Sequence, residues 1–194
     1  GQPASRISFA RLYVNNELEG IYGVVEEINA GYLARNFGAS DGHLFEYHWL
    51  RPFFFQDLGD DLAAYAPLFE PRTHERAPTA TLYSAIRELV RPTEGPQLWR
   101  DRVEPYLDLR QFVTMTAIEK FLAEFDGLTG YWGLNNFYLY RLPNSEQHVL
   151  LPWDRDNAFR PDAVSIHQGV LDNVILRQAL AFPDLKAHFF ATRE

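Results

Sequence analysis

A strand–turn–strand pattern between residues 137 and 152 constrains the fold more than any other feature of the chain. Residues 137–142 (FYLYRL) and 147–152 (QHVLLP) are rich in the aromatic and branched side chains that strands favour. Residues 143–146 (PNSE) are typical turn residues, so the two runs are predicted to pair as a β-hairpin. With this turn, position 142 faces 147, and position 136 faces 153 at the open end.

Polar residues gather at that open end. Asn136 precedes the first strand, and Asp154 and Asp156 follow the second. Opposed residues in a hairpin are only ~5 Å apart, so these side chains are predicted to lie together, with Asp126 brought in by a glycine-containing loop. Carboxylate and amide oxygens suit Mg²⁺, which keeps positions open for substrate phosphates. The alternative is that these residues only cap turns and helices.

The rest of the chain predicts an α+β fold, because strands and helices are segregated along the sequence rather than alternating. The expected elements are strands over 6–14, 20–27 and 43–47, a helix over 30–37 between Asn29 and Gly38, and helices from Thr79 or Thr81, over 96–104, from Asp108 and over 169–181. The helix after Asp108 has an apolar stripe that is predicted to be core and to carry Asp126 at its C-terminal end: Phe112, Met115, Ile118, Phe121, Leu122 and Phe125. Phe53, Phe54 and Phe55 are interpreted as core, with a clamp for a planar ligand as the alternative.

Composition excludes several classes of protein. At 194 residues the chain fits one domain with a substantial core. A net charge of −8 with only two lysines disfavours nucleic-acid binding and favours basic partners. No apolar run approaches the ~20 residues that span a bilayer. The absence of cysteine excludes disulfides and thiolate metal sites.

Four segments, in order, carry a resemblance to a known family. They are LYVNNELEGIYGVVEEIN (12–29), Tyr32-Leu33 through Leu44-Phe45, FLAEFDGL with NNFYLYR (121–128 and 135–141), and LLPWDRDNAF (150–159). The chain resembles the spore-coat protein H (CotH) kinases, which are secreted or surface-associated atypical protein kinases. This resemblance implies part of a protein-kinase-like fold in a single domain fragment. Residues 1–48 would be the end of the small lobe and the hinge, and residues 49–194 the mostly helical large lobe.

The resemblance also implies roles for individual residues. Asp126 is similar to the catalytic aspartate that accepts the substrate proton, Asn136 to a metal-binding asparagine, and Asp154 to the metal-binding aspartate, which Asp156 supports. The implied activity is ATP- and Mg²⁺-dependent phosphoryl transfer to Ser or Thr of a basic protein substrate, in an extracellular or cell-envelope location. The sequence sets neither the oligomeric state nor the substrate.

Three departures from the family pattern leave a second hypothesis open. The interval from Asp126 to Asn136 is longer than usual, and Glu46 stands where the family often has lysine. The phosphate-binding lysine is not found in this sequence, so the fragment alone is expected to be inactive. The alternative is a non-catalytic pseudokinase or surface-binding module on the same scaffold. Glycoside hydrolysis by paired carboxylates is a third reading, but no aromatic sugar platform stands out among the four tryptophans.

Overall fold

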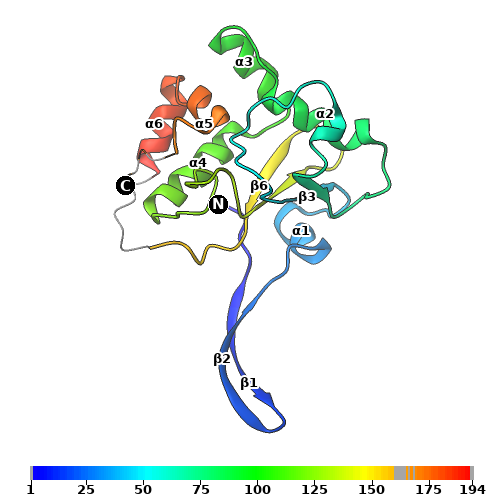
Figure 1. The fold of residues 1–194 in the computed structure, drawn as a ribbon, viewed down its shortest axis with the longest axis vertical. Coiled ribbons are helices and arrows are strands. Elements are labelled where there is room, and N and C mark those ends of the chain that lie inside the picture. The colour runs from blue at the N-terminus through cyan, green and yellow to red at the C-terminus, as the bar shows by residue number, and fades with distance from the viewer. Residues whose placement is uncertain (1, 160–164, 166, 168, 193–194) are drawn as a thin grey trace. The chain divides into compact units, whose positions relative to one another are not determined.

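The computed structural model describes residues 2–159, 165, 167 and 169–192 (Figure 1). The chain divides into two compact units, one of Pro3–Asp41 and one of Gln2 with the residues from Gly42 onward. The described residues form two antiparallel sheets and six α-helices, so the fold is mixed, as predicted, and its strands pair antiparallel. None of the helices in these ranges has the length and apolar character needed to cross a bilayer.

The first unit contains the hairpin of β1 (Ile7–Val14) and β2 (Glu17–Val25), followed by α1 (Ala30–Phe37). Asn15 and Asn16 form the turn with left-handed φ angles of 52° and 67°, a conformation that asparagine tolerates well in two-residue hairpin turns. The predicted loop over 15–19 is therefore too long, because Glu17 already pairs with Val14.

Helix α1 begins and ends where the sequence predicts. The Asn29 carboxamide oxygen accepts hydrogen bonds from the backbone N–H groups of Gly31 and Tyr32 at 2.9 and 3.2 Å, and Gly38 ends the helix with a φ of 76°. Just before the helix, hydrogen bonds from Arg6 and then Arg35 hold the pKa of the Glu26 carboxylate at about 2.

The second unit is built on a four-stranded antiparallel sheet. Its strand order is β4-β3-β5-β6, with β3 at His43–Tyr47, β4 at Phe69–Pro71, β5 at Phe137–Arg141 and β6 at His148–Pro152. The predicted register of the second hairpin is confirmed, because Phe137 pairs with Pro152 and Arg141 with His148. The backbone N–H of Trp153 donates to the Asn136 carbonyl at 3.1 Å, so positions 136 and 153 face each other as predicted.

The described residues of this unit form five α-helices and one 3₁₀ turn. They are α2 (Thr79–Val90), α3 (Pro96–Val103), α4 (Leu109–Phe121), α5 (Val174–Ala179), α6 (Pro183–Ala191) and the turn Leu62–Ala64. Figure 1 shows α4, α5 and α6 grouped together, and α4 also packs against β6. The predicted helix over 169–181 is too long, since α5 starts only after Asn173, whose side chain caps it by accepting from the Leu176 N–H at 3.0 Å.

The core of this unit is aromatic. Phe53 and Phe55 are fully buried and stack edge-on against each other, with Phe55 also contacting Phe112 and Phe137. This confirms the interpretation of Phe53 and Phe55 as core residues, whereas Phe54 is only half-buried. The burial of Phe53 and Phe55 leaves neither of these two rings open to clamp a planar ligand.

The last turn of α4 departs from the predicted apolar stripe. Phe112 and Met115 are buried as expected, but Phe121 is 65% exposed, while Glu119 and Lys120 are buried in its place. The prediction failed because periodicity assigns charged residues to the solvent face, whereas here tertiary packing encloses them. Helix α4 also ends at Phe121, so Asp126 lies in the loop beyond the helix and not at its end.

Candidate functional site

Asp126 is held by two neighbouring asparagine side chains. Its Oδ2 accepts hydrogen bonds from Asn135 Nδ2 at 3.0 Å and from Asn136 Nδ2 at 3.2 Å. Asn136 Nδ2 also donates to the Asp126 carbonyl at 3.1 Å. All three residues are half-buried, so the carboxylate keeps contact with solvent. Both of these side-chain hydrogen bonds end on Oδ2, and no hydrogen bond to Oδ1 is found within the described residues.

The backbone around Asp126 is fixed as well. The Asp126 N–H donates to Glu124 Oε1 at 2.8 Å, and the Asn135 N–H donates to the Gly127 carbonyl at 3.2 Å. Glu124 is almost fully buried. The loop between α4 and β5 therefore presents Asp126 from a rigid base, although it contains neither helix nor strand.

The two strands of the second hairpin stop at residues with left-handed backbones. Asn136, just before β5, has a φ of 58°, and Asp154, just after β6, has a φ of 44°. Such values are uncommon outside glycine and recur at functional sites, with Asn and Asp the residues that tolerate them best. Here they turn the chain away from the sheet at the end where the polar residues gather.

Negative charge accumulates at this end. Asp154 is an exposed residue, but nearby protein atoms desolvate its carboxyl enough to raise the pKa, and the carboxylates of Asp156 and Asp126 raise it further. Asp154 has no ion-pair partner in the described part of the chain. Asp156 is exposed, and its Oδ1 accepts a hydrogen bond from the Asn157 side chain at 2.9 Å. Carboxylates that repel one another in this way form an environment that favours a bound cation.

The structure thus joins some of the predicted site residues more closely than others. Asp126 and Asn136 are in direct contact, and Asp154 lies within electrostatic range of Asp126 and Asp156. The carboxylates of these three aspartates do not all converge within 4.8 Å of one another. Asn135, which holds Asp126, is a site residue that the sequence reasoning did not single out.

Arg155 lies between Asp154 and Asp156 in sequence and forms a salt bridge to a carboxylate. Its partner is the buried Glu119, with Arg155 Nη2 and Glu119 Oε1 2.6 Å apart. Burial raises the pKa of the Glu119 carboxyl, and the Arg155 charge opposes that rise. Burial likewise lowers the pKa of Lys120, the next residue in α4, to about 8. Buried charges of both signs therefore lie close to the Asp126 loop.

A small pocket of about 280 Å³ adjoins Asp126. It is lined by Trp49, Asp126, Trp132 and Asn135. The indole N–H of Trp49 donates to the Trp132 carbonyl at 3.1 Å, and the Trp132 ring packs edge-on against Tyr131 at 5.4 Å. Trp49 is 45% exposed and Trp132 53% exposed, so both offer aromatic surface beside the carboxylate. This pocket could not be predicted from the sequence, because Trp49 and Trp132 are distant along the chain.

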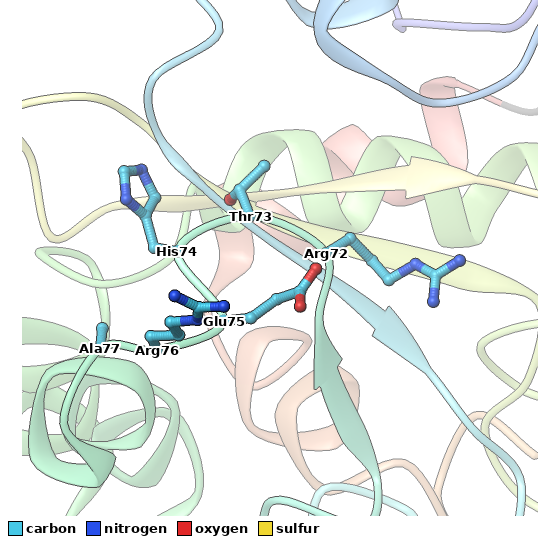
Figure 2. A pocket seen from close by; sticks show the side chains of 6 residues that line it. All are labelled: Arg72, Thr73, His74, Glu75, Arg76 and Ala77. Carbon is cyan, nitrogen blue, oxygen red and sulfur yellow. The ribbon is translucent and has the colours of Figure 1, made fainter.

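Two other polar features lie outside this site. A hollow of about 580 Å³ is lined by residues 72–77, the turn that follows β4, as Figure 2 shows, and none of the predicted site residues borders it. In the described part of the chain, the one group of three His or carboxylate ligand atoms within 4.8 Å is Glu46, His48 and Glu70. Arg72 already pairs with both glutamates at 3.2 and 3.1 Å, so their charge is balanced by a side chain.

Comparison with known proteins identifies the chain. No curated protein matches it significantly. Among protein families, residues 1–188 match the family described as CotH kinase protein, and this match covers nearly the whole sequence. The match confirms the resemblance carried by the four sequence segments, and the chain belongs to the CotH kinase family.

Proposed function

We propose that this chain is the catalytic part of a protein kinase that transfers the γ-phosphoryl group of ATP to a Ser or Thr hydroxyl in a Mg²⁺-dependent reaction. Membership in the CotH kinase family supports a kinase-like activity. The observation that carries the proposal is the doubly held Asp126 beside Asn136 at the open end of the hairpin, with Asp154 in electrostatic range. In this proposal residues 1–48 end the small lobe and residues 49–194 form the large lobe of a kinase-like fold.

Asp126 is proposed as the residue that orients the substrate hydroxyl and accepts its proton. Two amide donors on Oδ2 fix the orientation of the carboxylate and leave Oδ1 for the hydroxyl. Phosphoryl transfer depends mostly on positioning and on neutralising charge, so a rigidly held carboxylate is what the reaction requires.

Asn136, Asp154 and Asp156 are proposed as the residues that hold Mg²⁺. The donors suit this ion, because all are oxygen ligands. Desolvation raises the pKa of the Asp154 carboxyl, and the negative charges of Asp156 and Asp126 raise it further. The side-chain nitrogen of Asn136 donates to Asp126, so the side-chain oxygen of Asn136 (Oδ1) is proposed as the ligand atom. When bound, the metal would neutralise charge on the phosphates of ATP.

The test is phosphoryl transfer from radiolabelled ATP to a basic Ser/Thr-containing protein, measured with the full-length protein that contains this sequence. Asp126→Asn is expected to lower kcat by on the order of 10²- to 10⁴-fold, because it removes the proton acceptor. Asp154→Ala is expected to remove most of the activity, and added Mg²⁺ is expected not to stimulate the activity that remains. Asp101→Asn, an exposed aspartate on α3, serves as the control and should match the wild type. Full activity in both site variants would refute these roles.

A second candidate function is a pseudokinase, a surface-binding module on the same scaffold that does not transfer phosphate. Glu46 on β3 favours it, since the family often has lysine there and Glu46 instead pairs with Arg72 at 3.2 Å. A thermal-shift measurement with ATP and Mg²⁺ separates the two functions. A nucleotide-binding kinase gains about 2.7 kcal/mol at a ligand concentration of 100 Kd, whereas a module that does not bind nucleotide gains nothing.

A further inference from the structure

Beneath the Asp126 loop, a buried ion pair connects the two segments that carry the acidic residues. Glu119, in the last turn of α4, is 3% exposed. Its Oε2 accepts a hydrogen bond from the Leu128 N–H at 2.7 Å, which fixes the loop two residues after Asp126. Its Oε1 lies 2.6 Å from Nη2 of Arg155, the residue that separates Asp154 from Asp156. One carboxylate therefore contacts both segments at once.

The contact between Glu119 and Arg155 is an ion pair and not an aligned hydrogen bond. Neither Glu119 Oε1 nor the two terminal nitrogens of Arg155 has a hydrogen-bond partner within the described ranges, although all three atoms are buried. Stability alone is a poor reason for such a pair, since burying two charges costs about as much free energy as their attraction returns. The presence of this buried pair is better explained by the two chain segments that it holds together.

Gly127 shows how tightly the pair is packed against the loop. A Cβ atom at this position would lie 2.6 Å from Glu119 Oε2 and 2.9 Å from Arg155 Nη1, closer than real contacts allow. The residue directly after Asp126 therefore touches both partners of the ion pair. A displacement of either partner transmits to the backbone of the loop that holds Asp126.

Two further buried groups attach to the same loop. Glu124 Oε1 accepts from the Asp126 N–H at 2.8 Å, and the Lys120 ammonium donates to the Thr129 carbonyl at 3.5 Å. Two buried carboxylates and two cations thus balance one another around the backbone of residues 126–129. Among these charged groups of the described residues, Arg155 is the one that belongs to the segment of Asp154 and Asp156. A backbone hydrogen bond from the Phe125 N–H to the Asn157 carbonyl at 3.4 Å also joins the two segments.

We infer that Glu119 and Arg155 act together as positioning residues that couple the place of Asp126 to the place of the Asp154–Asp156 segment. The inference rests on the proposed function. In that function a proton acceptor and the residues that bind the metal lie on different segments, so the two segments must be held in a fixed geometry. Groups that orient the ligands of a metal without touching it typically change metal affinity or activity by about 10- to 100-fold when they are removed.

The test uses the double variant Glu119→Gln/Arg155→Met in the full-length protein. Glutamine still accepts from the Leu128 N–H, and no charge remains buried alone, so the fold is retained while the link to Arg155 is lost. Amide hydrogen exchange over residues 152–157 is expected to become about tenfold faster, and the Mg²⁺ concentration for half-maximal activity to rise about tenfold, with the KM for the protein substrate unchanged. Arg155→Lys, which keeps the charge, should recover part of both effects.

Arg100→Met is the matched control, since Arg100 forms ion pairs with Glu104 and Asp184 outside this site. It should leave exchange over 152–157 and the Mg²⁺ requirement as in the wild type. Unchanged exchange and unchanged Mg²⁺ requirement in the double variant would overturn the inference. If the wild type transfers no phosphate, the proposed function fails, and hydrogen exchange alone still decides whether the pair couples the two segments.

Discussion

Asn136 and Asp126 are joined twice, because the Asn136 carboxamide nitrogen donates both to Asp126 Oδ2 at 3.2 Å and to the Asp126 carbonyl at 3.1 Å. The two oxygens belong to one residue, so the amide fixes the side chain of Asp126 relative to its own backbone. Asn136 also adopts a φ of 58°, which asparagine tolerates better than most residues. The same residue therefore supports the site by its hydrogen bonds and by its backbone conformation.

Asn136→Asp is expected to be more damaging than Asn136→Ala. Aspartate keeps the shape of the side chain, but it replaces the amide group that donates both hydrogen bonds with an oxygen that faces a carbonyl and a carboxylate. The free energy of unfolding is therefore expected to fall by about 1–3 kcal/mol. Chemical denaturation measures this loss. Asn144→Asp is the control, because Asn144 has a similar φ of 55° but lies in the exposed hairpin turn. Equal losses at both positions would contradict the explanation.

Trp132→Ala is expected to raise the KM for the protein substrate about 2- to 10-fold with kcat little changed. The reason is that the exposed indole borders the pocket at Asp126, where a bound substrate segment would lose one aromatic contact. Steady-state kinetics with varied substrate measures the effect. Leu98→Ala removes an exposed apolar side chain from α3 instead and should leave KM as it is. A loss confined to kcat would show that Trp132 positions Asp126 and does not bind substrate.

The stability of the second unit is expected to fall as the pH drops from about 6.5 to 4, because of His148. Burial lowers the pKa of this imidazole to about 4, while Nδ1 lies 2.9 Å from the Tyr106 carbonyl. Between these two pH values the unfolded chain binds a proton at His148 that the folded chain does not bind. The free energy of unfolding therefore falls by on the order of 3 kcal/mol in total and does not fall further below pH 4. Denaturation at several pH values measures it.

His148→Asn removes this titration and retains a donor for the Tyr106 carbonyl. Its free energy of unfolding is therefore expected to vary less between pH 6.5 and 4 than that of the wild type. Identical pH profiles for the two proteins would show that His148 is not responsible. His43, whose pKa burial also lowers to about 4, is present in both proteins and cancels in the comparison.

Ile21→Lys is expected to reduce binding of a hydrophobic dye and aggregation of the isolated 194-residue chain without lowering its melting temperature. Ile21 is 73% exposed on β2, and its neighbours on the hairpin leave further apolar side chains open to solvent. Dye fluorescence and light scattering measure the change. The matched control is Ile86→Lys on α2, which buries an unpaired charge and should unfold the second unit. A lower melting temperature for Ile21→Lys would contradict the exposed position of Ile21.

Local rules in the sequence predicted the parts of the fold that are decided locally. The turn at 143–146 fixed the register of the second hairpin, and the side chains of Asn29 and Asp108 predicted the starts of their helices, since each accepts from the backbone two or three residues on. The turn between β1 and β2 was predicted too long, because the sequence did not reveal that both asparagines adopt left-handed backbones.

Features that depend on distant contacts were not predictable. Glu119 and Lys120 are charged residues in an amphipathic helix, so periodicity assigned them to solvent, and only the folded loop of residues 126–129 encloses them. The contact of Glu46 and His48 with Glu70 required the pairing of β3 with β4, which the sequence did not reveal. The role of Asn135 was missed because the family resemblance implied a role only for its neighbour Asn136.

The antiparallel ribbon of β5 and β6 has its turn at one end and its acidic residues at the other. Lengthening the turn at Asn144 and Ser145 adds residues beyond the last paired positions and leaves the pairing of Phe137 with Pro152 unchanged. This tip is therefore a suitable place to insert a fluorescent reporter or an affinity tag, because the insertion would lie at the opposite end of the ribbon from Asn136 and Asp154.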